Sequence, residues 1–181
     1  MTAGSFATEA RAKKITDEPQ IIEVPEHPSV IELHAYLERI RGDREMADRA
    51  DIKPSEIARL LPSMIIAEAV DGGEDFRVRL FGTKLVELLG EERTGKLLSE
   101  FAEEGGAFSS KDPGAVQRRW LFVTRKAFFG RKPVFLKVPF AASGRLYLVG
   151  HCVSAPLTAG GTEPAQTVGA MFVTRVENPA L

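Results

Sequence analysis

The sequence is poor in cysteine, with Cys152 as its single example, so no disulfide can form within the chain. A chain without internal disulfides is expected in a reducing compartment. Its first residues lack the positively charged start and apolar block of a secretion signal. No window approaches the roughly 20 apolar residues that span a membrane. These absences predict a cytoplasmic protein without a membrane partner.

Catalytic and metal-binding motifs are also lacking. The histidines, His27, His34 and His151, are far apart, and neither C-x-x-C nor H-E-x-x-H occurs. There is no Gly-rich phosphate loop and no G-x-S-x-G elbow. His151 and Cys152 are the one pair that resembles a base beside a nucleophile, but adjacent strand residues point to opposite sheet faces. The sequence therefore requires no metal and no cofactor, and an enzyme on an α+β scaffold is the weakest hypothesis.

The charge balance gives little reason to expect nucleic acid as a partner, since the formal net charge is −1. The charges are nevertheless uneven, because no Asp or Glu occurs between Pro113 and Thr162. The basic run from Arg118 to Lys132, with interleaved phenylalanines, has the composition of a nucleic-acid contact, but also that of a solvent-facing helix. We expect the second. A basic face that pairs with an acidic face or binds an anionic partner is a further hypothesis.

The N-terminal region divides into a tail and a helix. Residues 1–28 lack sustained periodicity and are interrupted by Pro19 and Pro25, which predicts a flexible tail, although Ile21, Ile22 and Val24 could lie against the domain as a short extended piece. Ser29 and Glu32 fit a capping box, and Gly42 ends the helical pattern. The apolar stripe of this helix consists of Val30, Leu33, Leu37 and Ile40. It packs either on the chain's own domain or on a second copy, so these four residues are our candidates for a dimer interface.

Further helices are predicted by apolar spacing and by end signals. Residues 51–62 are expected to form a short helix with Pro54 in its first turn, and residues 83–89 a second one that ends at Gly90. Asp112 and Pro113 form an N-cap and first-turn pair. They begin the longest helix, which we expect to end near Phe129.

Strands are predicted where apolar residues alternate with polar ones or form a short, largely apolar run. The five segments are residues 64–70, 76–80, 136–140, 145–153 and 168–176. Short strands in hairpins, with the inner helices between the second and third, predict an α+β fold. We expect a five-stranded antiparallel sheet with helices on one face plus an N-terminal helical extension. The predicted divisions are a tail over 1–28, a helical cap over 29–62 and a domain over 63–177.

Three short motifs resemble those of a known family. They are Ala50-Asp51-Ile52-Lys53-Pro54, then Phe76-Arg77-Val78-Arg79-Leu80-Phe81-Gly82-Thr83, then Gly90 followed after three residues by Thr94-Gly95-Lys96. In order and spacing they are similar to the motifs of bacterial, largely single-domain PAS proteins, over roughly residues 30–176. Lys53 departs from the acidic residue that is frequent there, and the first helix lacks the expected tryptophan.

We expect the main role of the motif residues to be structural rather than functional. We expect Arg79 to reach polar groups near the N-terminal helices, with Arg49 or Asp51 as its partner. Thr83 is the expected cap of the helix that begins there. The complete set of structural motif residues is Arg49, Asp51, Pro54, Arg79, Gly82, Thr83 and Gly95.

The resemblance implies a PAS fold and a non-enzymatic signalling module that acts through homodimerisation and through a signalling protein partner. The alternative is a sensor with a small molecule between the sheet and the inner helices. The candidate wall residues, which otherwise fill a core, are Leu85, Leu89, Trp120, Phe122, Leu136, Leu148 and Met171. Cys152 lacks the sequence context of a flavin photoreceptor, and nothing favours His34 or His151 as a haem ligand. The identity of any ligand or cofactor is left open.

Overall fold

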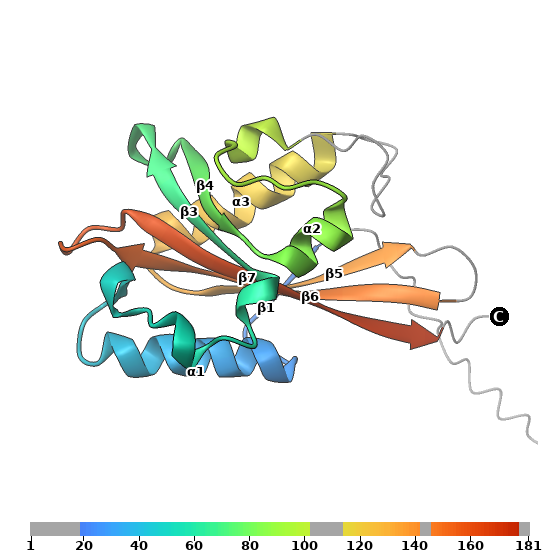
Figure 1. Ribbon diagram of the computed structural model, residues 1–181, viewed down its shortest axis with the longest axis horizontal. Helices are drawn as coiled ribbons and strands as arrows, with labels where there is room; N and C mark the ends of the chain where they lie inside the picture. The colour runs from blue at the N-terminus through green and yellow to red at the C-terminus, as the bar shows by residue number, and fades with distance from the viewer. Residues whose placement is uncertain (1–18, 102–113, 142–145, 178–181) are drawn as a thin grey trace, which may run out of the picture.

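Strands β3 to β7 build an antiparallel sheet in a computed structural model, which describes residues 19–101, 114–141 and 146–177 (Figure 1). The strands span Met64–Val70 (β3), Asp75–Phe81 (β4), Val134–Ala141 (β5), Leu146–Thr158 (β6) and Gln166–Glu177 (β7). Their order across the sheet is β5-β6-β7-β3-β4, and each neighbouring pair is antiparallel. The predicted α+β class and five-stranded antiparallel sheet are therefore confirmed.

Two small strands from the N-terminal region extend this sheet. Strand β1, Gln20–Ile22, pairs antiparallel with β5, and β2, Ala47–Asp48, pairs parallel with β6. Ile22 is partly buried against the core. Residues 20–22 are therefore not a flexible tail but the short extended piece that the sequence allowed at Ile21 and Ile22, held by pairing with β5 and by packing of Ile22. Residues 1–18 lie outside the described residues.

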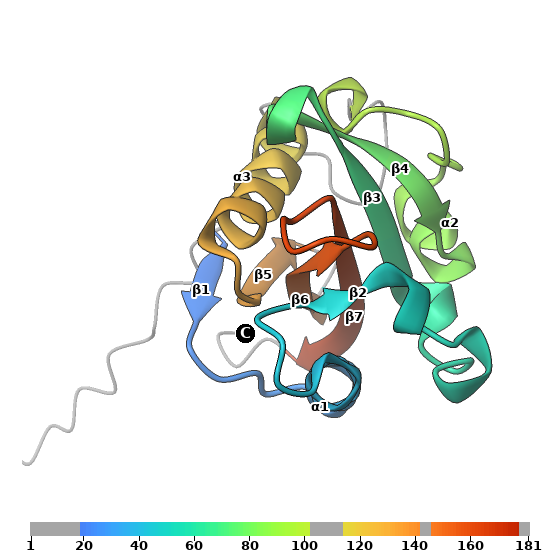
Figure 2. The ribbon, with the colours of Figure 1, turned by 90° about the vertical axis from the view of Figure 1, so that its left-hand side faces the viewer.

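Helices cover both faces of the sheet. Helix α1 spans Pro28–Arg41, α2 spans Thr83–Leu89 and α3 spans Gly114–Gly130. Figures 1 and 2 show α1 on one face and α2 with α3 on the other. The N-terminal helical extension therefore closes the face that the inner helices leave open. The predicted start of α3 at Asp112 and Pro113 lies outside the described residues.

Alternation along β3 decides which side chains meet which helices. Met64 and Ile66 belong to the cluster that contains the buried side of α1, whereas Ile65 and Ala67 belong to the cluster beneath α2 and α3. Successive residues of a strand point to opposite faces, so one apolar strand serves two cores. This arrangement explains why the sequence of β3 is a nearly continuous apolar run.

The apolar stripe of α1 packs on the chain's own sheet. Val30, Leu33 and Leu37 are buried, with Leu33 completely inaccessible, and Ile40 packs partly buried against the same cluster. Burial of one such side chain stabilises the fold by about 1.5–3 kcal/mol. The assignment of these four residues to a dimer interface is therefore wrong, because the fold has already used this surface. Homodimerisation itself stays a prediction.

The start of α1 differs from the predicted capping box. The N-cap is His27, whose Nδ1 accepts a hydrogen bond from the backbone N–H of Ser29 at 3.1 Å. Pro28 occupies the first helical position, where a missing N–H costs nothing. The N-cap therefore lies two residues earlier than the Ser29–Glu32 pattern predicts.

The predicted helix over residues 51–62 is replaced by three short 3₁₀ turns. These turns span Arg49–Asp51, Pro54–Glu56 and Leu61–Ser63. Proline cannot donate to a preceding carbonyl and disfavours helical geometry in the residue before it. Pro54 and Pro62 therefore allow single turns but no continuous helix. The buried residues Ile57 and Leu60 still face the core, as their spacing indicates.

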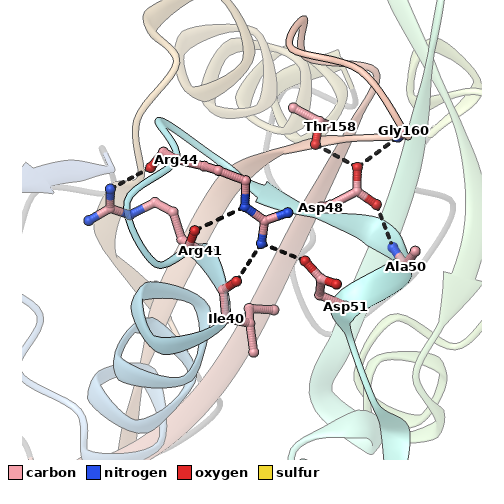
Figure 3. Close-up of polar contacts among 8 residues, drawn as sticks. All are labelled: Ile40, Arg41, Arg44, Asp48, Ala50, Asp51, Thr158 and Gly160. Carbon is pink, nitrogen blue, oxygen red and sulfur yellow. Dashed lines mark hydrogen bonds and ion pairs between the residues drawn. The ribbon is translucent and has the colours of Figure 1, made fainter.

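Arg44 holds the end of α1 (Figure 3). Its guanidinium donates to the carbonyl oxygens of Ile40 and Arg41, at 2.5 and 3.0 Å, and to the carboxylate of Asp51 at 2.5 Å. The last carbonyls of a helix have no partner within it, and a cation placed there satisfies them. Arg44 thereby fixes the path from α1 into the loop that leads to β2.

Asp48 fastens that loop to the sheet (Figure 3). It is buried and accepts hydrogen bonds from the N–H of Ala50 at 2.8 Å, the hydroxyl of Thr158 at 2.7 Å and the N–H of Gly160 at 2.7 Å. Because the bonds to Gly160, Ala50 and Thr158 favour the charged form, they lower the pKa of the Asp48 carboxyl. A buried carboxylate that accepts three hydrogen bonds has a structural role, which here is to hold the loop against the sheet.

Candidate functional site

A small cavity lies between α3 and the sheet. Its volume is about 90 Å³. Helices α2 and α3 contribute residues on one side, and β3, β5, β6 and β7 on the other, with Leu98 and Pro19 completing the wall. The lining residues are Pro19, Ile65, Ala67, Leu89, Leu98, Arg119, Trp120, Phe122, Val123, Thr124, Leu136, Val138, Cys152, Val153, Ser154, Thr167, Gly169, Ala170 and Met171.

Five of the seven predicted wall residues line this cavity: Leu89, Trp120, Phe122, Leu136 and Met171. The other two do not. Leu85 is buried within the same apolar cluster as Leu89, and Leu148 lies half-buried farther along β6.

Several lining residues were not among the predicted ones. Val138, Ser154 and Thr167 each lie an even number of residues from a wall residue on the same strand, namely from Leu136, Cys152 and Met171 respectively. Extending the two-residue period along each strand would have found them.

The interior chemistry of the cavity is mostly apolar. Thr124, Ser154 and Thr167 are buried hydroxyl residues in its wall, and Arg119 is a half-buried cation there. Burial raises the pKa of the Cys152 thiol to about 12. The wall therefore offers a few hydrogen-bonding groups in an apolar surround, and its thiol is fully protonated at neutral pH.

His151 and Cys152 do not form a catalytic pair. Cys152 packs with the cluster beneath α3. His151 points to the α1 side, where its Nε2 lies 3.1 Å from the Thr174 hydroxyl and its ring centroid 5.1 Å from that of His27. Burial, together with the nearby His27, lowers the pKa of His151. The two neighbours therefore occupy opposite faces of β6, as expected from strand geometry.

Large prosthetic groups do not fit this cavity. Pockets for drug-sized ligands typically enclose about 300–1,000 Å³, well above the volume under α3. A flavin ring therefore has no room in this arrangement of side chains. Neither His34, which stacks edge-on against Phe135, nor His151 lines the cavity, so no histidine is placed to hold a haem there.

Metal clusters and membrane-spanning helices are both missing from the described ranges. Those residues include no group of three or more His, Cys, Asp or Glu side chains that could hold a metal ion. Among the same residues, no helix is long and apolar enough to cross a membrane.

The outer face of α3 forms a second feature, a shallow groove. Phe122 and Phe129 are exposed to 56% and 58%, although the opposite side of the helix is buried. Arg125 donates to the backbone carbonyl of Glu74 and lies 3.3 Å from its carboxylate. We call this surface the α3 groove, and its lining residues are Arg118, Leu121, Phe122, Arg125, Lys126 and Phe129. Phe122 lines both the cavity and the α3 groove.

The charged motif residues pair differently from the prediction. Arg79 binds Glu68 on the neighbouring strand β3, so the expected partners near the N-terminal helices are wrong. Cross-strand neighbours are the closest carboxylates that an outward side chain of β4 meets. Asp51 instead pairs with Arg44. Arg49 begins the first 3₁₀ turn and is half-buried.

The uncharged motif residues shape the backbone. The N-cap of α2 is Gly82, and Thr83 makes no side-chain cap bond, so the predicted cap at Thr83 is wrong. A Cβ at Gly82 would lie 2.3 Å from the carbonyl oxygen of Pro62. Gly95 has φ +89° and donates to the carbonyl of Val78, which seats its turn against β4. These motif residues are therefore structural.

The sheet order β5-β6-β7-β3-β4, with helices inserted between β4 and β5 that cover one face, defines the PAS fold of signalling sensor domains. The family model of the PAS domain matches residues 25–118, and the chain belongs to this family. No curated protein matches the chain.

The fold resembles solved structures of three sensor proteins. A fungal LOV domain photoreceptor is 16% identical with a TM-score of 0.43, over 81% of this chain and 94% of that one. An RNA-binding light-oxygen-voltage receptor is 12% identical with a TM-score of 0.43, over 87% of this chain and 38% of that one. A sensory box histidine kinase/response regulator from Burkholderia thailandensis E264 is 11% identical with a TM-score of 0.36, over 67% of this chain and 85% of that one.

Proposed function

We propose that this chain is a non-enzymatic PAS sensor module that holds a small apolar molecule between α3 and the sheet. The observation that carries the proposal is the apolar-lined cavity of about 90 Å³. A void in a packed core removes contacts from every side chain around it, so a molecule that fills it gains those contacts back. Occupancy of this cavity is therefore linked to the stability of the domain.

The size and lining of the cavity define the class of ligand. An engineered cavity of about 150 Å³ binds benzene or xenon, so the smaller volume here suits a molecule of a few heavy atoms. We infer that outward rotation of the half-exposed Phe122 would make room for a small ring. The buried hydroxyls of Thr124, Ser154 and Thr167 allow such a molecule one hydrogen-bonding group.

The proposal also holds that the cavity has no catalytic activity, and the residues of the cavity wall support this part. A thiolate, not a thiol, is the nucleophile in cysteine chemistry. Burial raises the pKa of Cys152 to about 12, and the neighbouring His151 lies on the other face of the strand. The cavity thus presents a packing surface to its ligand, and we infer that signalling output passes to a protein partner.

Thermal unfolding with xenon, benzene and indole tests the proposal. We expect at least one of these to raise the Tm of the wild-type protein in a concentration-dependent way. Cys152→Met should abolish the rise, because its longer side chain occupies the cavity. Cys152→Ala, which leaves the space open, should keep it. No rise with any of the three, or a rise that survives in Cys152→Met, would show the proposal to be wrong.

A second candidate, a pure protein-interaction module, is favoured by the exposed aromatic side chains of the α3 groove. In that case the cavity is a packing defect and the small molecules leave Tm unchanged. Native mass spectrometry of the purified protein separates the two: retained mass that leaves on unfolding supports the sensor. The same spectrum reports whether the protein is a homodimer.

A further inference from the structure

The α3 groove combines exposed aromatic rings with cations. Leu121, Phe122 and Phe129 supply apolar surface, and Arg118, Arg125 and Lys126 surround it. Large aromatic side chains and arginine are the residue types most enriched at protein interfaces. Two phenylalanines exposed to more than half on one helix are costly in water, and their burial by a partner would recover that free energy.

The charge around the groove is of one sign over a long stretch of chain. No Asp or Glu occurs between Pro113 and Thr162, so α3 itself carries cations alone. Within the described residues, the carboxylate of Glu74, on the turn before β4, contacts Arg125 and offsets part of this charge. A ligand that approaches α3 therefore meets a positive field with an apolar centre.

We propose that the α3 groove binds an acidic amphipathic helix of a partner protein. Its apolar side chains pack on Phe122 and Phe129, and its carboxylates pair with the cations at the groove edges. The outward stripe Arg118, Phe122, Lys126 and Phe129 follows helical spacing, which matches the i, i+4 anchors of a second helix. The proposal does not depend on the occupancy of the cavity.

Charge and composition favour this occupant over two rivals. A second copy seated symmetrically on the same groove would bring identical cations together, because a two-fold interface pairs a patch with itself. A nucleic acid needs cations that follow its backbone. The α3 groove instead places three cations, Arg118, Arg125 and Lys126, around an apolar centre, which suits the apolar face of a helix better than a phosphate backbone.

Fluorescence anisotropy with designed peptides tests the proposal on the full chain. The probe is a fluorescein-labelled amphipathic helix with leucine on one face and glutamate on the other, and its matched peptides carry glutamine or lysine in place of glutamate. We expect the acidic peptide to bind, to weaken as salt is raised and to bind more tightly than the other two. No binding of the acidic peptide, or equal binding of the lysine peptide, overturns the proposal.

Paired variants locate the binding surface. Phe129→Ser and Lys126→Glu should each weaken the acidic peptide by about tenfold. Val24→Ser removes another exposed apolar side chain (71% exposed), and Lys84→Glu removes an exposed cation on α2, and both should bind as the wild type does. Circular dichroism confirms that each variant is folded. If Phe129→Ser and Lys126→Glu bind unchanged, the site is not on α3.

The rivals give distinct outcomes in the same set of variants. A dimer seen by sedimentation that Phe129→Ser and Lys126→Glu convert to monomer makes the groove an interface between copies and overturns the proposal. A labelled single-stranded oligonucleotide that binds more tightly than the acidic peptide, and is lost in Lys126→Glu, makes it a nucleic-acid site and also overturns it.

Discussion

Asp48 on β2 accepts a hydrogen bond of 2.7 Å from the hydroxyl of Thr158 at the end of β6, across 110 residues of chain. The same carboxylate accepts from the N–H groups of Gly160 and Ala50. The bonds from Thr158 and Gly160 attach the loop after α1 to the end of β6, in the sheet that lines the cavity. The position of α1 is therefore tied to the sheet by a polar contact as well as by the apolar stripe.

Replacement of Asp48 tests this fastening. Asp48→Ala removes the acceptor of three hydrogen bonds, one of them from the buried hydroxyl of Thr158, so we expect the free energy of unfolding to fall by roughly 2–3 kcal/mol. Asp51→Ala breaks the exposed ion pair with Arg44 and should cost at most about 1 kcal/mol. Urea unfolding of both variants gives the comparison. Equal losses would show that Asp48 is no more important than an exposed ion pair.

Asp48 also predicts a dependence on pH. Its pKa in the folded protein is lowered by the hydrogen bonds from Gly160, Ala50 and Thr158. Its contribution to stability is thus complete above the unfolded value of about 3.9 and is lost as pH falls through the folded pKa. In acid, Asp48→Asn should show a flatter loss of stability than the wild type. If the free energies of unfolding of the two proteins fall in parallel as pH is lowered, protonation of Asp48 does not contribute to the loss.

Gly82 should tolerate no side chain. A Cβ there would lie 2.3 Å from the carbonyl oxygen of Pro62 and 2.5 Å from that of Leu61, and backbone atoms cannot rotate away. We expect Gly82→Ala to cost about 3 kcal/mol or more. Gly161→Ala meets no atom within 4 Å and needs no unusual backbone angle, so it should be near neutral. Differential scanning calorimetry measures both, and a stable Gly82→Ala would show that the turn can shift.

Substitutions of Leu33 and Ile31 test whether α1 packs in the core or at a dimer interface. Leu33 is completely buried against the chain's own sheet, whereas Ile31 on the same helix is 46% exposed. Leu33→Ala should lower the free energy of unfolding by about 2–5 kcal/mol at every protein concentration. Ile31→Ala should change it by less than about 0.5 kcal/mol. A loss at Leu33 that grows as the protein is diluted would return this residue to a dimer interface.

Two histidines lie together at the start of α1. His27 accepts from the N–H of Ser29 and its ring centroid is 5.1 Å from that of His151. The ion pair of Lys137 and Glu26, 2.7 Å between Nζ and Oε2, lies beside them. Burial lowers the pKa of both rings, and for His151 the neighbouring His27 and Lys137 add to the shift while Glu26 opposes it.

The histidine pair predicts a second loss of stability, at mildly acidic pH. Because the folded pKa values are below the unfolded value of about 6.5, the unfolded chain binds more protons below that pH. The free energy of unfolding should therefore fall as pH drops through about 6.5 and level off below the folded pKa values. The double variant His27→Asn, His151→Gln keeps a capping side chain but cannot titrate, and its stability should be flat over this window. A wild-type protein that is equally flat contradicts the prediction.

Because Phe122 lines both the cavity and the α3 groove, we expect binding at one of these sites to change the affinity of the other. If a cavity ligand changes the affinity of the acidic peptide, the peptide must change the affinity of that ligand by the same factor. We expect the coupling factor to approach one in Phe122→Ala, whereas Phe129→Ala weakens the peptide but keeps the coupling. Titration calorimetry of each ligand in the presence of the other gives the factor. A coupling that survives in Phe122→Ala would have to travel by another route.

Most of the correct predictions about the fold come from the regular spacing of apolar residues along the sequence. The strands β3, β4, β5, β6 and β7 follow from apolar alternation or from short apolar runs, and the helix α2 follows from helical spacing, since these patterns reflect which faces are buried. The wall residues Trp120, Leu136 and Met171 were predicted for the same reason. A two-residue or helical period identifies a buried face even when its contacts are unknown.

The remaining features depend on contacts between distant segments. Asp48 lies in a polar stretch, and only the meeting of β2 with β6 shows that its donors come from Thr158 and Gly160. The apolar stripe of α1 has the same spacing whether it covers a sheet or a second helix, so its period could not choose between them. The cap at His27 was missed because Ser29 and Glu32 supplied a stronger local pattern.

Helix α1 covers one face of the sheet and therefore competes with any protein that would bind to that face. It seals that face with Val30, Leu33 and Leu37, which are all buried. Any protein that binds there must first displace the helix, so its apparent affinity is reduced by the small fraction of molecules in which α1 is detached. The free energy that holds α1 in place thus sets a threshold for access to this face. Among the described residues, no helix covers the outer surface of α3 in this way, so a partner can bind there without displacing one.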